Sequence, residues 1–418
     1  MNLDANAAVT TTPSSTPPVP SVSEKRLRVL ILTKVFPSAL EPVAAAFNRQ
    51  QFAALARFAD IELLAPVPWF PGAAASGPRT GAGKLARLPS FEWIDGLFVR
   101  HPRVFHLPRI DYTVAAGLYV ASLFPLVRRL RDRFDVILGS FVYPDGIAAT
   151  WMGRLLGIPS VVYALGSDIN VAPKIFGVPA QLRRTLPRAS RIIAVSRDLA
   201  DKSIALGAPP ERTVVVPNGV DRRLFFPRDR AAARATLGLA SDAHLVVYVG
   251  RVEPAKGIPE LLTAFETIAA ADPKAALAIV GGGSLKDRCA QAAAAFPGRV
   301  HVAGPRPLEE VSTWVAASDL VTLPSHNEGT PNVVLEALAG GRRVVATNVG
   351  GIPDLITTPA LGELVPPRDP DALAAALLRV LKEPGDAAAI SAAGPVTWDE
   401  SARILAEVLR AAIADPAP

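Results

Sequence analysis

The sequence predicts an α/β protein built from two Rossmann-like domains that face each other across a cleft. Three observations indicate this fold class. Short apolar runs alternate with helical stretches, which favours parallel sheets covered by helices. The chain has 418 residues, which is long for a single domain at roughly 100–200 residues each. Half of its residues are hydrophobic, so large cores can form.

The predicted strands fall into two series. Many of them end in Gly, Ser or Asn, as expected where a parallel sheet presents its ligand-binding loops. The first series comprises Arg28–Leu32, Ile61–Ala65, Val136–Ser140, Ser160–Tyr163, Arg191–Val195 and Thr213–Val216. The second comprises His244–Val249, Ala275–Val280, Val300–Ala303, Leu320–Leu323 and Val344–Ala346.

Composition places the boundaries between these units. Residues 1–25 are rich in Thr, Ser, Pro and Ala and are expected to form a disordered leader. A seam of Pro and charged residues at 219–229 separates the two series of strands. We therefore expect an N-terminal domain at 26–222 and a C-terminal domain at 223–394, with a helix and tail at 395–418. The aperiodic segment Gly72–Pro89 is expected to be a loop.

Charge and cysteine content narrow the class of protein. A single cysteine excludes a disulfide framework and fits a reducing cytoplasm. Apolar stretches fall short of the roughly 20 residues of a membrane-spanning helix. Residues 1–222 carry a net charge of +10 and the remainder −4, which suggests an anionic partner for the first half. No zinc-finger, helix-turn-helix or single-strand-binding motif accompanies that charge, so nucleic acid is not expected.

The most informative segment runs from Ser325 to Glu336. It follows a predicted strand and opens a helix, with Thr330 expected as the N-cap and Pro331 as the first helical residue. The free amides of this first turn suit an anionic or hydroxyl-rich ligand. Glu328 precedes the turn and Glu336 lies within the helix, with seven residues between them.

Neighbouring strand ends supply cations and flexible backbone. Gly250 and Arg251 end one strand and are followed by Lys256-Gly257. Gly281 and Gly282 end the next strand along the chain. The carboxyl ends of parallel strands meet at one edge of a sheet. The sequence therefore predicts a pocket for a polyanion that carries a hydroxylated group.

These elements resemble the family 4 retaining glycosyltransferases, which have the two-Rossmann (GT-B) architecture. The resemblance rests on the Glu-x7-Glu pair, on Gly250–Gly257, and on Val216-Pro-Asn-Gly-Val-Asp221. It implies that Arg251 and Lys256 bind the donor diphosphate, that Glu328 faces the donor sugar and that Glu336 holds the nucleotide ribose. It also implies that a C-terminal helix crosses back to the first domain. The donor contacts that it implies lie at Gly250, Gly281, Gly282, Gly329, Thr330, Pro331, Asn332, Val333 and Glu336.

The N-terminal half carries weaker signals for the acceptor or sugar side. The segments around Asp145 and around Ser167-Asp168 are similar to a subgroup that acts in polysaccharide and teichuronic-acid-type assembly. Asp145 and Asp168 could bind hydroxyls or could cap the helices that follow, and both interpretations remain open. Asn218 belongs to the same set. Leu165 stands where many members carry a His, and Ala45-Ala46 where a Gly is common.

Two further patterns concern the membrane and metals. The segment Leu118–Arg133 is apolar and then strongly basic, so it could dock on an anionic membrane or form a core helix with a solvated end. Asp369 and Asp371 have an Asp-x-Asp spacing, but they precede an Ala/Leu-rich helix and are interpreted as capping residues. The histidines at 101, 106, 244 and 301 are interpreted as structural, whereas His326 lies close to Glu328. No cofactor or metal site is predicted.

Together these patterns predict a retaining glycosyltransferase. It would move a sugar from a UDP- or GDP-linked donor to a glycan or lipid-linked acceptor in polysaccharide or cell-envelope biosynthesis. We expect it in the cytoplasm, with contact to the inner face of the membrane left open. The alternatives are a nucleotide-sugar epimerase of the same fold, a catalytically silent sugar-nucleotide-binding module, and a basic nucleic-acid-binding protein.

Overall fold

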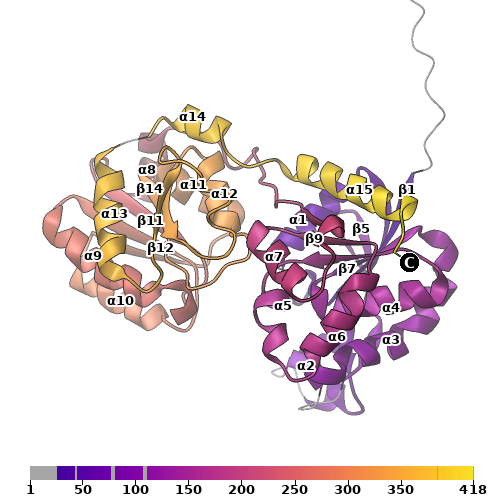
Figure 1. The fold of residues 1–418 in the computed structure, drawn as a ribbon. Helices are drawn as coiled ribbons and strands as arrows, with labels where there is room; N and C mark the ends of the chain where they lie inside the picture. The colour runs from indigo at the N-terminus through magenta and orange to yellow at the C-terminus, as the bar shows by residue number, and fades with distance from the viewer. Residues whose placement is uncertain (1–25, 43–44, 77–80, 107–110, 384, 418) are drawn as a thin grey trace, which may run out of the picture.

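The computed structural model describes residues 26–42, 45–76, 81–106, 111–383 and 385–417. The chain forms two lobes side by side, each built on its own sheet (Figure 1). The predicted leader at 1–25 lies outside the described residues.

The N-terminal lobe contains an eight-stranded sheet in the order β10-β9-β8-β7-β1-β2-β5-β4. Every pairing is parallel except that of β4 with β5. Strands β3 (Val67–Trp69) and β6 (Arg103–Phe105) form a separate parallel pair. The main strands are β1 (Leu27–Thr33), β2 (Ala59–Leu64), β4 (Phe91–Ile94), β5 (Leu97–Arg100), β7 (Val136–Ser140), β8 (Ser160–Ala164), β9 (Arg191–Ala194) and β10 (Thr213–Val215).

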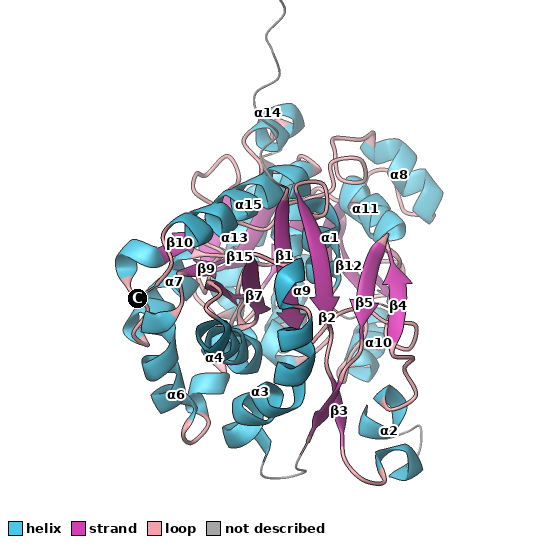
Figure 2. Cartoon of the chain, turned by 90° about the vertical axis from the view of Figure 1, so that its right-hand side faces the viewer, coloured by secondary structure: helices cyan, strands magenta, loops and turns pink. Residues whose placement is uncertain are grey.

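The two faces of this sheet carry separate cores because side chains alternate along each strand. On one face, Val29 and Ile31 pack with α1 (Ala46–Leu55) and α15 (Trp398–Ala414). On the other face, Leu30 and Leu32 pack with α3 (Asp111–Arg129) and α4 (Ile147–Leu156). Figure 2 shows these helices around strands β1 and β2. The remaining helices of the lobe are α2 (Gly81–Leu85), α5 (Ser167–Asn170), α6 (Val178–Thr185) and α7 (Arg197–Ala205).

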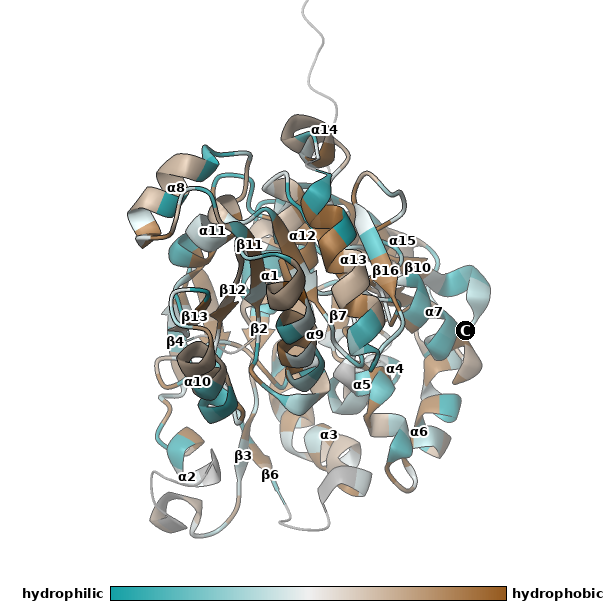
Figure 3. Ribbon diagram, turned by 90° about the vertical axis from the view of Figure 1, so that its left-hand side faces the viewer, coloured by the Kyte–Doolittle hydropathy of each residue, from teal (hydrophilic) through white to brown (hydrophobic). Residues whose placement is uncertain are grey.

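The C-terminal lobe contains a six-stranded parallel sheet in the order β13-β12-β11-β14-β15-β16. Hydrophobic residues concentrate in its interior strands, as Figure 3 shows for β11 and β12. The strands are β11 (His244–Val249), β12 (Ala275–Val280), β13 (Val300–Gly304), β14 (Leu320–Leu323), β15 (Arg343–Thr347) and β16 (Gly362–Val365). The helices are α8 (Arg230–Leu237), α9 (Ile258–Ala271), α10 (Lys286–Ala295), α11 (Leu308–Ala317), α12 (Asn332–Ala339), α13 (Pro370–Lys382) and α14 (Ala387–Ala392).

Helix α15 crosses from the C-terminal lobe back to the N-terminal lobe, which confirms the prediction. Its start is fixed by a capping box, in which the Thr397 hydroxyl accepts the Glu400 amide and the Glu400 carboxylate accepts the Thr397 amide. Its buried face carries Leu405 and Leu409, which lie in the same core as α1.

All eleven predicted strands are present, but four features were missed. The segment Gly72–Pro89, expected to be a loop, contains a short 3-10 helix at Ala73–Ser76 and helix α2. The small sheet β3–β6, the hairpin β4–β5 and strand β16 were also not predicted. These strands are only three or four residues long, too short for an alternating pattern to stand out.

The basic segment Leu118–Arg133 forms the end of α3 and a 3-10 turn at Arg131–Arg133. Leu123 and Val127 are fully buried, while Arg128 and Arg129 are exposed. This geometry favours a core helix with a solvated end. No helix among the described residues is long and apolar enough to cross a membrane.

Candidate active site

The carboxyl ends of β11 and β12 meet where the sequence predicts the donor pocket. Gly281 has a φ of 145°, and a Cβ at this position would lie 1.8 Å from the carbonyl oxygen of Gly250. Only glycine permits so close an approach of the two strand ends. Gly282 similarly leaves only 3.0 Å between a hypothetical Cβ and Pro305.

Lys256 and Glu328 form an ion pair in this region, with Nζ 2.5 Å from Oε1. Their side chains are 18% and 11% exposed, respectively. Lys256 comes from the turn after β11 and Glu328 from the loop after β14, two adjacent strands. The structure thus brings together two predicted catalytic residues that lie 72 positions apart in the sequence.

Helix α9 fixes the loop that carries Glu328. The imidazole Nε2 of His326 lies 2.9 Å from Oε1 of Glu260, and the His326 amide donates to the Ala255 carbonyl. A Cβ on Gly257 would lie 1.9 Å from the Pro324 carbonyl oxygen. His326 is therefore a positioning residue that ties the Glu328 loop to the Lys256 turn.

The predicted N-cap of α12 is wrong by one residue. The helix begins at Asn332 with Pro331 as its N-cap, and the Thr330 hydroxyl instead donates to the Val195 carbonyl at 2.6 Å. A bond to the other lobe has replaced the local cap. Val333 lies in the first turn of the helix, and the helix ends at Gly340 as predicted.

Other contacts in the same loop also join the lobes. A Cβ on Gly329 would lie 2.6 Å from the Leu165 carbonyl oxygen. The side-chain amide of Asn218 donates to Oδ1 of Asn332 at 3.0 Å. Asn218 therefore lies at the lobe boundary beside the predicted donor residues.

Glu336 lies on α12 with most of its side chain buried. Burial raises the pKa of this carboxyl from its ordinary 4.5 to about 7. No hydrogen bond or ion pair joins the carboxylate to any described residue. A partly buried carboxylate without a donor suits a hydroxylated ligand.

Arg251 is exposed at the end of β11, and its backbone carbonyl accepts the Tyr248 hydroxyl at 2.7 Å. Within the described ranges its guanidinium forms no ion pair. The cation is therefore available to an anionic ligand, whereas Lys256 must first exchange its partner.

On the N-terminal side, Asp168 caps loops. It is 1% exposed, and its oxygens accept the backbone amides of Val142 at 2.6 Å and Gly166 at 2.7 Å, with a longer bond from Leu165. Burial raises its pKa, although these amides oppose the effect. Asp168 therefore does not cap the helix that follows it, and its oxygens instead hold the loop after β7 against the loop after β8. Ser167 is the first residue of α5, and its side chain lies outside the described part of the chain.

Asp145 is fully buried. Its Oδ2 accepts the Lys34 amide at 3.0 Å, whereas Oδ1 has no hydrogen-bond partner among the described residues. Burial raises the pKa of this carboxyl well above its ordinary value, and the charge of Lys34 opposes that rise. Asp145 fixes the end of β1 and does not cap a helix.

Lys34 itself was missed by the sequence reasoning. It follows β1, and its Nζ donates to the Tyr143 carbonyl at 3.0 Å and lies 5.0 Å from the centroid of the Phe141 ring. Phe141 has a φ of 100°, which is rare for a residue other than glycine. A single lysine after a strand gave no signal in the sequence.

Ala45 adopts the left-handed conformation (φ 44°) at a position where the family often has Gly.

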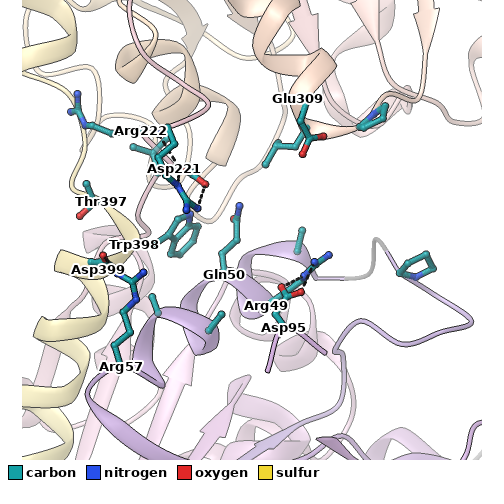
Figure 4. A pocket seen from close by; sticks show the side chains of 18 of the residues that line it. Arg49, Gln50, Arg57, Asp95, Asp221, Arg222, Glu309, Thr397, Trp398 and Asp399 are labelled. Atoms are coloured by element: carbon teal, nitrogen blue, oxygen red, sulfur yellow. Dashed lines mark hydrogen bonds and ion pairs between the residues drawn. The ribbon is translucent and has the colours of Figure 1, made fainter. Parts of the chain in front are cut away.

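A cavity of about 860 Å³ lies between the lobes on the outer side of α1 (Figure 4). It is bounded by Gln50, by Trp398 at the start of α15, and by Glu309 of the C-terminal lobe. Ion pairs such as Arg49–Asp95 and Arg57–Asp399 line it. None of the predicted donor residues lines this cavity, so its size does not make it the donor site.

Within the described ranges, no cluster of three or more His, Cys, Asp or Glu side chains is placed to hold a metal. Asp369 is the N-cap of α13 and accepts the Ala372 amide at 2.9 Å, which confirms its predicted capping role.

Comparison with known structures supports the fold. A sucrose-phosphate synthase from Thermosynechococcus elongatus superposes with a TM-score of 0.70 at 21% identity, covering 93% of this chain and 99% of that one. The Anabaena protein HepE, solved in complex with UDP, superposes with a TM-score of 0.68 at 21% identity, covering 92% and 100%. The two-lobed GT-B architecture predicted from the sequence is thus confirmed.

Sequence comparison gives the family. Residues 243–383 match the model described as glycosyl transferases group 1, and residues 80–224 match that of glycosyltransferase family 4. A Bacillus subtilis protein named as a teichuronic acid biosynthesis glycosyltransferase, TuaC, is 32% identical over 84% of this chain and 89% of its own. A D-inositol 3-phosphate glycosyltransferase from Thermobispora bispora is 36% identical over 78% and 82%. The chain belongs to the family 4 glycosyltransferases and is an enzyme of that class.

Proposed function

We propose that this glycosyltransferase takes its sugar from a nucleoside diphosphate and transfers it with retention of configuration. One observation carries the proposal. Two cations and two carboxylates, Arg251, Lys256, Glu328 and Glu336, come from adjacent strand ends and from α12. This set offers two cations for a diphosphate and one carboxylate each for the sugar and the ribose that flank the diphosphate in a nucleotide sugar.

Binding would begin with an exchange of partners. The donor diphosphate reaches Arg251, which is exposed, and draws Lys256 away from Glu328. The released carboxylate then accepts hydrogen bonds from hydroxyls of the donor sugar. Glu336, once ionised, accepts hydrogen bonds from the ribose hydroxyls.

In the transfer step, the bond between the anomeric carbon and the phosphate oxygen breaks, and a bond to the acceptor oxygen forms on the same face of the sugar. The electron pair leaves with the diphosphate, whose growing charge Arg251 and Lys256 stabilise. The phosphate oxygen takes the proton of the acceptor hydroxyl. No protein nucleophile is assigned, so we favour attack without a glycosyl-enzyme intermediate.

We place the acceptor in polysaccharide or cell-envelope assembly, as a glycan or a lipid-linked glycan. The 32% identity with the teichuronic acid biosynthesis protein supports this class. The UDP bound in the HepE complex supports a UDP-linked donor over a GDP-linked one. The exposed arginines that end α3 would favour a position at the inner face of an anionic membrane.

The test is incubation of the purified chain with UDP- and GDP-sugars and an envelope extract as the acceptor source. We expect release of nucleoside diphosphate that depends on the extract. Donor isomerisation without acceptor would identify an epimerase instead, and donor binding without turnover would identify a silent module.

Variants locate the activity. Glu328→Ala and Lys256→Ala should each abolish most turnover in folded protein. Lys274→Ala is a matched control, because Lys274 pairs with Asp242 at 3.1 Å but both side chains are more than half exposed. Full turnover by both site variants would contradict the assignment.

A further inference from the structure

We propose that Lys34 anchors an anionic group, either a phosphate or a carboxylate, on the acceptor. The inference rests on the proposed function, since it adds the class of acceptor to a donor pocket already assigned. It concerns the N-terminal lobe, for which the sequence provided no cation at the site.

Lys34 lies on the acceptor side of the donor loop. Strands β8, β7 and β1 are neighbours in the sheet, and Gly166, Phe141 and Lys34 follow their respective ends. A Cβ on Gly166 would lie 3.4 Å from Cα of Gly329, the residue after Glu328. Lys34 is therefore two strand spacings, about 10 Å, from the contact between the lobes. An acceptor that reaches the donor sugar beside Glu328 would meet Lys34 if it extended about 10 Å along the ends of these strands.

The lysine is held in place without an ion-pair partner. Its side chain is partly buried, and its Nζ donates to the Tyr143 carbonyl and faces the Phe141 ring. No carboxylate among the described residues lies within ion-pair distance of it. The ammonium has three N–H groups, so a donor remains for a ligand. A charge-assisted hydrogen bond from this group is roughly twice as strong as a neutral one.

The backbone beneath Lys34 is strained. Phe141, with φ 100° and ψ 134°, occupies a region that costs a residue with a side chain about 1–3 kcal/mol. The Gly146 amide donates to the Phe141 carbonyl at 2.8 Å and the Phe141 amide to the Tyr163 carbonyl at 3.0 Å, which holds this conformation. Such strain persists where the surrounding structure fixes it, and here it places an aromatic ring against a cation.

Two buried carboxyls lie near the lysine without forming an ion pair with it. Asp145 is fully buried, and the raised pKa keeps it protonated to higher pH than an exposed aspartate. Asp168 directs its oxygens to backbone amides. The charge of Lys34 opposes the rise in the pKa of both carboxyls, yet neither forms an ion pair with its Nζ. The ammonium can therefore meet an external anion, in the half of the chain that carries the +10 charge.

A kinetic experiment tests the role in acceptor binding. The envelope extract is separated by anion exchange into neutral and anionic acceptors, and transfer is measured with wild type, Lys34→Met and Lys34→Arg. We expect transfer to the anionic fraction, a KM for that fraction raised about tenfold in Lys34→Met, and a substantial recovery in Lys34→Arg. The kcat and the donor KM should stay within about twofold. Lys174→Met, an exposed lysine on the same lobe, is the control.

A binding experiment tests the site without turnover. Lysines are ¹³C-methylated, the Lys34 resonance is assigned by its loss in Lys34→Arg, and glucose, glucose 6-phosphate and glucuronate are added in turn. We expect glucose 6-phosphate, glucuronate or both to shift the Lys34 resonance, and the one that does identifies the anion. Glucose should have no effect.

The outcomes separate this inference from the proposed function. Loss of donor binding in Lys34→Met, measured with UDP alone, would assign the lysine to the donor and overturn the inference. An unchanged acceptor KM, or a Lys34 resonance that neither anion moves, would overturn it as well. If wild type binds no UDP and transfers no sugar, the proposed function fails, and the resonance experiment still decides on Lys34.

Discussion

Replacing Glu336 with glutamine should stabilise the C-terminal lobe at alkaline pH while weakening nucleotide binding. Burial raises the pKa of Glu336 to about 7, so the native chain holds a proton between pH 4.5 and about 7 that the unfolded chain has released. Stability falls with rising pH wherever the native state binds more protons. Wild type therefore loses stability through this window, and the neutral glutamine does not.

The magnitude follows from the pKa difference. A carboxyl whose pKa rises from 4.5 to about 7 on folding lowers the free energy of unfolding at pH values above this window. The loss is about 3 kcal/mol, at 1.36 kcal/mol per pKa unit. Because the side chain keeps some contact with solvent, we take about 2 kcal/mol as the expected gain. For a lobe of this size that gain corresponds to a rise of about 4–8 °C in Tm.

The assay is thermal unfolding of wild type and Glu336→Gln without ligand, at about pH 4 and about pH 8.5. The two proteins should unfold together near pH 4, below the window, and separate near pH 8.5, where the variant is the more stable. Affinity for UDP, measured by calorimetry, should fall in the variant because glutamine is the weaker acceptor for ribose hydroxyls. Glu266→Gln, on the exposed face of α9, is the control. An equal Tm near pH 8.5, or a shift of the same size at both pH values, would refute the reasoning.

Three further variants test other contacts. Lys256→Met should lower the affinity for UDP by tenfold or more. It should also destabilise the fold by about 1–3 kcal/mol, since it leaves Glu328 without its partner. An unchanged UDP affinity, measured by calorimetry, would contradict the role of Lys256 in binding the diphosphate. Gly281→Ala should lower the free energy of unfolding, measured in urea, by several kcal/mol, because its Cβ would lie 1.8 Å from a carbonyl oxygen. Its control, Gly298→Ala, has open space around the added Cβ and should lower it by about 1 kcal/mol. Asp168→Ala should lower the free energy of unfolding by about 2–4 kcal/mol, because buried amides lose their acceptor. Asp201→Ala, at an exposed position, should change it little. Similar losses in both variants would contradict the role of Asp168 as the acceptor of these amides.

The fold and the donor loops could be predicted because their signals are local. Strands such as Ala275–Val280 are fully buried and appear as continuous apolar runs. Glycines and charges placed directly after such strands fall at one edge of the sheet whatever the details of packing. This reasoning located Lys256 and Glu328, which the structure joins in an ion pair.

The features that were missed depend on contacts distant in sequence. Thr330 has the residue type of an N-cap, yet its hydroxyl bonds to Val195 across the lobe boundary. The contacts that position the Lys34 ammonium come from the Tyr143 carbonyl and the Phe141 ring, more than a hundred residues away in the sequence. Neither a propensity nor a spacing contains this information, because both describe neighbours along the chain.

The loop that carries Glu328 joins the two halves of the proposed mechanism. On one side Glu328 pairs with Lys256; on the other, the next two residues touch the N-terminal lobe, Gly329 against the Leu165 carbonyl and Thr330 through its hydroxyl. A Cβ on Gly350 would lie 1.9 Å from the Glu328 carbonyl oxygen, so the backbone of Gly350 also packs closely against this loop. When the donor diphosphate replaces Glu328 as the partner of Lys256, the Glu328 carboxylate must reorient. The backbone of its loop is fixed by the contacts described above. Such reorientation is confined to the side chain, and the contact with the acceptor lobe can persist while the donor binds.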